Sequence, residues 1–222
     1  YEARYLEKEA QYAALCNQIR PHFLFNALNT IHVLIKTGRD DEAVQCIDML
    51  AILLRGMVSA DREITLRAEL KIVESYLVLQ QKRYGSLSYA LPEAGALGDY
   101  LLPALTLQPL VENALVHGCE PKRGSTHIAL TLTRADGELA IAVADNGMGM
   151  SGKKLAELRA ALAEATVEPF QTEPGIGLVN IARRVKLRFG VAYGLTIESR
   201  EGEGTTVTLH LPLQGESQCL EP

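Results

Sequence analysis

The chain has 222 residues, of which 47% are hydrophobic and 22% are charged, a balance that is ordinary for a globular protein. Its formal net charge is −5 and its basic residues are scattered, so the composition gives no indication of a nucleic-acid partner. No run of about 18 apolar residues is present, so no segment of this sequence is expected to span a membrane. Because the chain begins at Tyr1, within a strongly helical stretch and without a signal peptide, we expect it to be a fragment of a longer protein.

Residues 1 to about 84 have a helical pattern and no strand signal. The first stretch consists of good helix formers except for Pro21, whose ring crowds the preceding turn and predicts a kink just before His22. Gly38 predicts the end of this helix, and Asp40 predicts the N-cap of a second one. The apolar residues at core spacing on the second helix are Val44, Ile47, Leu50, Ala51 and Leu54.

A third helical stretch begins at about Leu66 and carries Leu70, Val73, Leu77 and Gln80 on one face. Short connections between long amphipathic helices predict antiparallel packing, and hence a helical hairpin. One hairpin leaves an apolar face uncovered, and two copies paired as a four-helix bundle would cover it, so we expect a homodimer. The alternative is that the helices dock on the C-terminal half of the same chain.

After about residue 84 the pattern becomes a mixture of helices and strands. A helix is expected over Leu105–His117, and strands are expected over 126–134 and 138–144, joined by a hairpin turn at 135–137. The remaining expected elements are helices over 155–165 and 176–189 and strands over 195–199 and 205–211. The predicted fold is therefore α+β: an antiparallel helical hairpin in residues 1–84, followed in residues 85–215 by an α/β sandwich with helices on one face of a mixed sheet.

One polar stripe lies on the first helix. His22, Asn26 and Asn29 recur at i, i+4 and i+7, which places all three on one helical face. One turn after His22, the Asn26 amide has the spacing to hold a water molecule for dephosphorylation of a partner aspartate. The alternative role for Asn26 is to bridge the helix interface.

Four segments of the C-terminal half have the composition of a nucleotide pocket. In Leu110–Gly118, Asn113 and His117 are i, i+4 neighbours, and an asparagine offers a neutral oxygen to a hard cation such as Mg²⁺. In 145–149, Asp145 follows a strand and precedes two glycines; its carboxylate is an acceptor suited to the amino group of a base.

The third segment, Pro174–Asn180, places glycines just before a helix, where backbone N–H groups can approach phosphates. The fourth, Gly202–Thr206, has small residues before the last strand. A single Gly-x-Gly is usually a turn, and no Gly-x-x-x-x-Gly-Lys-Ser/Thr phosphate loop is present. It is the four segments in this order that indicate a site.

The order of the Asn113 segment, Asp-x-Gly-x-Gly, Gly-x-Gly-Leu and Gly-Thr-Thr resembles the GHKL ATPase superfamily of gyrase, the heat-shock chaperone, histidine kinases and MutL. The segment Pro21-His22-Phe23-Leu24-Phe25-Asn26 narrows the resemblance to sensor histidine kinases of the LytS/YehU type, and the likeness runs from about residue 15 to 212. It implies that this chain is the cytoplasmic part of a membrane-anchored sensor. Such a protein autophosphorylates from ATP and Mg²⁺ and passes the phosphoryl group to an aspartate on a response-regulator receiver domain.

The resemblance also implies a role for each matching residue. His22 would be the phosphoacceptor, whose imidazole nitrogen attacks the γ-phosphorus of ATP. Asn113 would ligate Mg²⁺, with Glu112 beside it as a second contact, and Asp145 would read adenine. The other implied nucleotide-binding residues are Gly147 and Gly149 in the floor of the base pocket, Gly175, Gly177 and Leu178 at the hinge of a lid over the phosphates, and Thr205 and Thr206 near the adenine end.

The sequence departs from related proteins at three positions. Phe23 stands where many histidine kinases have an acidic residue that takes the histidine proton. Pro109 stands where the chaperone class has a water-activating glutamate, which favours transfer to histidine over hydrolysis and disfavours a MutL-like clamp. Val116 replaces a common lysine, so a phosphate contact is either absent or supplied by His117 or Arg183. Phe23 and Val116 leave open a degenerate kinase that regulates its partner through dimer geometry.

Overall fold

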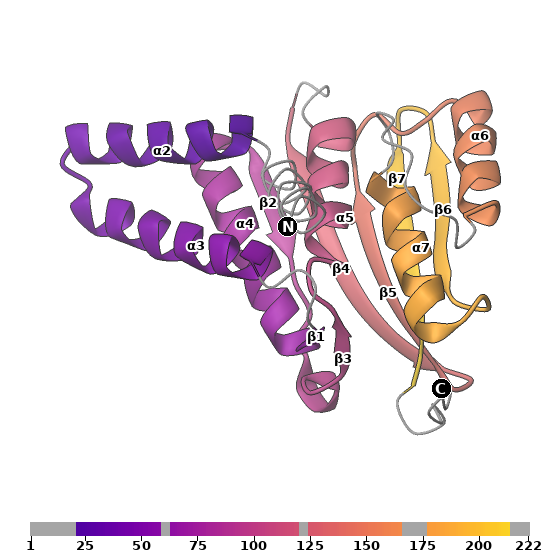
Figure 1. Ribbon diagram of the computed structural model, residues 1–222. Coiled ribbons are helices and arrows are strands. Elements are labelled where there is room, and N and C mark those ends of the chain that lie inside the picture. The colour runs from indigo at the N-terminus through magenta and orange to yellow at the C-terminus, as the bar shows by residue number, and fades with distance from the viewer. Residues whose placement is uncertain (1–20, 59–62, 120–123, 166–176, 214–222) are drawn as a thin grey trace, which may run out of the picture.

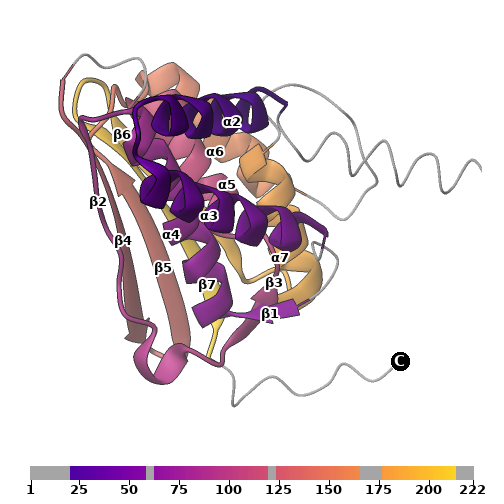
Figure 2. The ribbon, with the colours of Figure 1, turned by 90° about the vertical axis from the view of Figure 1, so that its left-hand side faces the viewer.

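The computed structural model describes residues 21–58, 63–119, 124–165 and 177–213. Helices and a sheet form two layers, and the hairpin of the first two described helices projects from them (Figures 1 and 2). In chain order the elements are α2 (Pro21–Lys36), α3 (Asp40–Val58), β1 (Glu63–Thr65), α4 (Leu66–Arg83), β2 (Leu87–Ala90), η1 (Gly95–Leu97), β3 (Leu101–Pro103), α5 (Gln108–Asn113), η2 (Ala114–Cys119), β4 (Thr126–Ala135), β5 (Glu138–Asp145), α6 (Gly152–Ala163), α7 (Gly177–Phe189), β6 (Gly194–Arg200) and β7 (Gly204–Pro212).

The main sheet has the strand order β2-β4-β5-β7-β6. Its only parallel pair is β2 with β4, and the other neighbours are antiparallel. Asp136 and Gly137 join β4 to β5 with φ angles of 51° and 78°, the two left-handed residues that a tight hairpin turn requires. The sheet is mixed and its helices lie on one face (Figure 2), which confirms the predicted α+β class.

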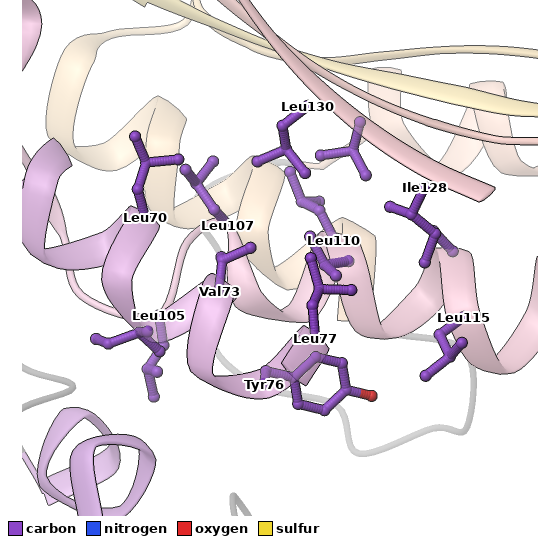
Figure 3. Close-up of a cluster of buried hydrophobic side chains, with 14 of the residues drawn as sticks. Leu70, Val73, Tyr76, Leu77, Leu105, Leu107, Leu110, Leu115, Ile128 and Leu130 are labelled. Carbon is purple, nitrogen blue, oxygen red and sulfur yellow. The ribbon is translucent and has the colours of Figure 1, made fainter. Parts of the chain in front are cut away.

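The core lies between the sheet and helices α4, α5 and α7. Figure 3 shows Leu70, Val73 and Leu77 of α4 directed toward Leu107 and Leu110, with side chains of β4 on the far side. All the apolar members of this group are buried. Helix α4 therefore shares its core with the sheet layer as well as packing against α3.

The hairpin of α2 and α3 ends its first helix as predicted at Gly38, which has a φ of 72°. The N–H of Gly38 donates to Ile35 O (3.1 Å) and that of Arg39 donates to Leu34 O (2.9 Å), the two bonds of a Schellman motif. Asp40 is the first residue of α3 rather than its N-cap, because the Ala43 N–H already donates to Arg39 O.

Several expectations about local structure were wrong. Val44 and Ile47 are 57% and 49% exposed within the single chain, whereas Leu50 is buried as expected. Ala43, Cys46 and Leu53 complete the buried stripe of α3. Three short strands, β1, β2 and β3, occupy segments expected to be helix or loop. They were not predicted because their pairing partners are distant in sequence. The helix expected over 105–117 begins only at Gln108 and continues as π-helix from Ala114.

None of the helices in the described ranges has the length and hydropathy needed to cross a membrane.

Candidate functional site

The end of β5 forms one side of the site. Asp145 is the last residue of this strand and pairs with Thr205 of β7, while Ala144 pairs with Thr206. The Asp145 carboxylate is half-buried, and its Oδ1 accepts a hydrogen bond from the Gly147 N–H (2.8 Å). This bond fixes the carboxylate over the turn that leaves the strand.

Two glycines allow the π-helical turn to approach Asp145. A Cβ atom on Gly118 would lie 2.5 Å from Asp145 Oδ1, and one on Gly147 would lie 2.1 Å from Gly118 O. The Met148 N–H donates to the same Gly118 carbonyl (2.8 Å). A side chain at position 147 would therefore meet backbone atoms, and one at position 118 would displace the Asp145 carboxylate. Gly118 was not singled out from the sequence, although it ends the segment that contains Asn113.

The loop after β5 is also fastened to the β6–β7 turn. Gly149 has a φ of 63°, and a Cβ there would lie 1.9 Å from Arg200 O; Gly204 has a φ of 121°, and its Cβ would lie 2.0 Å from Asp145 O. The Gly202 N–H donates to Met148 O (2.7 Å). The glycines of the fourth segment thus allow contact with the end of β5, a role that the spacing alone did not reveal.

A serine also connects the loop after β5 to the turn between β6 and β7. Ser199 Oγ accepts from the Met150 N–H (2.9 Å), donates to Gly204 O (3.0 Å) and lies 2.9 Å from Thr205 Oγ1. Ser199 could not be identified from local sequence patterns, because its partners come from two other segments.

Asn113 lies where α5 becomes the π-helical η2. Its Nδ2 donates to Pro109 O (2.9 Å), so the amide nitrogen is directed back along the helix and Oδ1 takes no part in this bond. A Cβ on Gly177 would lie 3.4 Å from this Nδ2, so the third segment meets the first at this point. Glu112 is half-buried on the same turn, and His117 is exposed.

The start of α7 lies beside Asn113. Gly177 is its first residue, and Leu178 is buried beneath it. Gly175 lies outside the described residues. Within the described part of the chain, no group of three or more His, Cys, Asp or Glu side chains is arranged to hold a metal ion.

The polar stripe lies on α2. His22 is in the first turn of this helix, and its side chain is outside the described residues. Asn26 is half-buried and lines a small cavity against α4, together with Ala27, Thr30, Leu79, Gln80 and Arg83. This cavity lies between α2 and α4.

A buried carboxylate that the sequence analysis missed supports α5. Glu69 of α4 is completely buried, and its oxygens accept the N–H groups of Leu105 and Leu107 at 3.0 and 2.7 Å. Burial raises the pKa of Glu69, while these N–H donors and the charge of Arg184 act in the opposite direction. The available signal was its place on the apolar face of α4, between Leu66 and Leu70.

Leu105 has a φ of 57°, a left-handed conformation that costs a non-glycine residue on the order of 1–3 kcal/mol. The chain adopts it at the entrance to the helix that carries Asn113. Such a conformation persists only where its surroundings enforce it, and here the enforcing groups are the Glu69 carboxylate and the core around Leu105.

Comparison with known proteins gives two adjacent family matches. Residues 10–87 match a family described as histidine kinase, and residues 98–215 match one described as histidine kinase-, DNA gyrase B-, and HSP90-like ATPase.

The chain is 35% identical over 217 residues to the sensor histidine kinase YesM of Bacillus subtilis, covering 97% of this chain and 35% of that protein. It is 33% identical over 217 residues to the sensor histidine kinase YpdA of Escherichia coli, covering 96% of this chain and 36% of that protein. It is 33% identical over 214 residues to the sensor protein LytS of Bacillus subtilis, covering 94% of this chain and 35% of that protein. The chain therefore spans about a third of the length of these curated relatives.

Proposed function

This chain belongs to the histidine kinase-, DNA gyrase B-, and HSP90-like ATPase family, and we propose that it is the kinase region of a sensor histidine kinase. In this proposal it transfers the γ-phosphoryl group of ATP to His22 and then to an aspartate of a response-regulator receiver domain. The observation that carries the proposal is the convergence of Asn113, Gly118, Asp145 and Gly177 at one end of the sheet, in a chain whose preceding helices contain His22. Residues 1–84 would serve dimerisation and phosphotransfer, and residues 85–215 would bind ATP.

The Asp145 end suits adenine. A carboxylate accepts several hydrogen bonds at once, so Asp145 can hold the Gly147 N–H and also take one from the exocyclic amino group of the base. Gly118, Gly147 and Gly149 allow the segments beneath it to pack closely. Thr205 and Thr206, across the ladder from this strand end, would line the adenine side of the pocket.

The Asn113 end suits the triphosphate. Mg²⁺ takes oxygen ligands and is usually held by one or two protein groups together with substrate phosphates, and Asn113 Oδ1 would be one such protein ligand. When bound, the ion would neutralise charge that develops on the phosphate oxygens. Glu112 and His117 on the same turn, and Gly175, Gly177 and Leu178 around the start of α7, would contact the phosphates and the hinge above them.

At the phosphoacceptor, a neutral imidazole nitrogen of His22 would attack the γ-phosphorus, and ADP would leave with the bond electrons. Phosphoryl transfer depends mainly on positioning and charge neutralisation, so a site assembled from two parts of the chain is suited to it. Phe23 follows His22, so the histidine proton passes to water or to a base elsewhere. The overall test is incubation with γ-labelled ATP and Mg²⁺, followed by acid and base treatment: a phosphohistidine is lost in acid and survives base.

Replacing Asn113 with alanine is expected to weaken Mg²⁺–ATP binding by about 10- to 100-fold, because it removes the oxygen assigned to the metal. Isothermal titration of ATP with Mg²⁺ and with EDTA measures the effect. Asn113→Asp is the matched control, since it keeps an oxygen ligand but loses the Nδ2 bond to Pro109 O. If the aspartate variant binds Mg²⁺–ATP as poorly as the alanine variant, Asn113 acts through the helix and not as a metal ligand.

Asn26→Ala is expected to leave His22 labelling within about twofold of wild type while abolishing dephosphorylation of the phosphorylated receiver aspartate. The reason is the i+4 spacing from His22, which suits an amide that holds the hydrolytic water. Time courses of labelled His22 and of labelled receiver domain separate the two activities, with exposed Asn29→Ala as the control. Loss of both activities would instead assign Asn26 to the packing of α2 on α4.

The hairpin also fits a second copy of itself. Its exposed apolar side chains lie on both helices and are Phe25, Leu28, Val33, Ile35, Val44 and Ile47. Apolar side chains exposed in this way on both helices of a hairpin are covered when two hairpins form a four-helix bundle. We therefore include a homodimer in the proposal.

The double variant Phe25→Glu/Ile47→Glu is expected to raise the dimer dissociation constant by at least about 100-fold, because each carboxylate would be buried without a partner. Light scattering over a concentration series measures the mass. Leu187→Glu, which places the same charge at a 61% exposed leucine of α7, should remain dimeric. A double variant with the wild-type mass would place the dimer interface elsewhere.

The relatives are named sensors and are about three times longer than this chain. We accordingly place the chain on the cytoplasmic side of a membrane-anchored protein whose other parts detect the stimulus.

A further inference from the structure

The loop that enters α5 is held from two sides by charged side chains of two other helices. The loop consists of residues 105–108, and it leads into the six-residue helix that ends at Asn113. The carboxylate of Glu69 on α4 accepts hydrogen bonds from N–H groups of the loop. The guanidinium of Arg184 on α7 donates a hydrogen bond to a carbonyl oxygen of the loop. Neither residue belongs to the four segments that form the pocket.

Glu69 replaces a helix cap. Leu107, at the N-cap of α5, offers no side-chain acceptor, and Pro109 within the first turn has no N–H. The Glu69 carboxylate takes the N–H of Leu107 (2.7 Å) and of Gln108 (3.4 Å) through Oε1, and that of Leu105 (3.0 Å) through Oε2. The start of α5 is therefore capped by a residue from another helix, within the core shown in Figure 3.

Arg184 holds the opposite side of the loop. Its Nη2 donates to Leu105 O (2.6 Å) and lies 3.5 Å from Thr106 Oγ1, whose hydroxyl donates to Pro103 O. Leu105 thus has its N–H bound to α4 and its carbonyl bound to α7. The bond from Arg184 has a charged donor, and a hydrogen bond of that class is stronger than a neutral one.

Helices α5 and α7 consequently meet at two places. Gly177, at the start of α7, meets Asn113 at the end of α5, and Arg184, two turns further along α7, meets Leu105 at the entrance to α5. Because the contact between Arg184 and Leu105 is held by a hydrogen bond, it restricts how far α5 can slide or rotate along α7. The separation of Asn113 from Gly177 therefore depends on the hydrogen bonds that Glu69 and Arg184 make to the loop.

We propose that Glu69 and Arg184 are positioning residues that set Asn113 against Gly177, so that the placement of α4 controls the affinity of the nucleotide site. The inference rests on the proposed function, because it assigns Asn113 and Gly177 to ATP. Helix α4 also packs on α3, so it connects the helical hairpin to the nucleotide site through Glu69.

The test is the affinity for Mg²⁺–ATP of Glu69→Gln, Arg184→Gln and the double variant, measured by titration well below the unfolding temperature. Glu69→Gln keeps the shape but turns an amide NH₂ toward backbone donors, and its dissociation constant should rise at least tenfold. Arg184→Gln should raise the dissociation constant for Mg²⁺–ATP three- to tenfold. Because both act on the same loop, the double variant should show a rise smaller than the product of the two.

Glu74→Gln is the matched control, an exposed glutamate on the same helix, and should bind as the wild type does. The KM for ATP should rise with the dissociation constant, while the labelling rate at saturating ATP stays within about threefold of wild type. A Glu69→Gln protein that is folded, has a lower Tm, and binds ATP within twofold of wild type would overturn the inference by making Glu69 purely structural.

If Glu69→Gln does not fold, the affinities of Arg184→Gln and Arg184→Lys test the inference. Arg184 is only half-buried, so these variants are expected to fold. Unchanged affinity in both folded variants would overturn the inference, and a weakened affinity that lysine partly restores would support it. A wild-type protein that binds ATP but does not label His22 would contradict the proposed function and leave this comparison of affinities intact.

Discussion

His22→Ala should reduce acid-labile, base-stable labelling from γ-labelled ATP to background, a loss of at least about 1,000-fold. The imidazole nitrogen is the atom that forms the bond to phosphorus, and an alanine side chain has no atom to replace it. ATP binding should remain within about twofold of wild type, since the pocket residues lie in a different part of the chain. Quenched labelling time courses and ATP titrations measure the two quantities.

His32→Ala is the matched control, because His32 is an exposed histidine on the same helix. It should label as the wild type does. Persistent label in His22→Ala would transfer the phosphoacceptor role to another residue. Absence of label in the wild-type dimer, with ATP bound, would favour a degenerate kinase that acts through dimer geometry.

Gly147→Ala should weaken ATP binding by about 100-fold and lower the free energy of unfolding by about 1–3 kcal/mol, the usual cost of overpacking. Its Cβ would lie 2.1 Å from Gly118 O and 2.5 Å from Gly118 Cα, and both are backbone atoms that no rotamer change can move. Separating the two segments would disturb the floor beside Asp145. Chemical denaturation and ATP titration measure the two effects.

Gly152→Ala provides the comparison five residues later. A Cβ there has no atom within 4 Å, and the residue begins α6, where alanine is favourable. It should retain ATP affinity and be at least as stable as the wild type. An equal loss of ATP affinity in both variants would show that the close contact at Gly147 is not what forms the pocket.

The family and the fold class were predicted from the sequence and are confirmed. The order of four glycine- and asparagine-containing segments identified the ATPase family, and period-two alternation around Asp136-Gly137 located the central hairpin of the sheet. Both signals are local, so they can be read from consecutive residues. The site roles assigned to His22, Asn113 and Asp145 remain predictions.

What the sequence did not reveal depends on contacts between distant segments. β2 pairs with β4 across 39 residues in register, and nothing within its four residues marks it as a strand. The left-handed Leu105 is enforced by a carboxylate 36 residues earlier. Val44 and Ile47 have the spacing of core residues, yet the chain by itself leaves them exposed.

The π-helical turn at Ala114–Cys119 shifts the phase of the helix that contains Asn113. In an α-helix the residue that shares a face with Asn113 is His117, whereas a π turn, whose bonds span five residues, brings Gly118 around instead. Here His117 is exposed, and Gly118 is the residue in contact with Asp145. In the proposed nucleotide site, a single continuous helix would thereby present an amide to the triphosphate and a bare backbone surface to the base, two chemically unlike parts of one nucleotide.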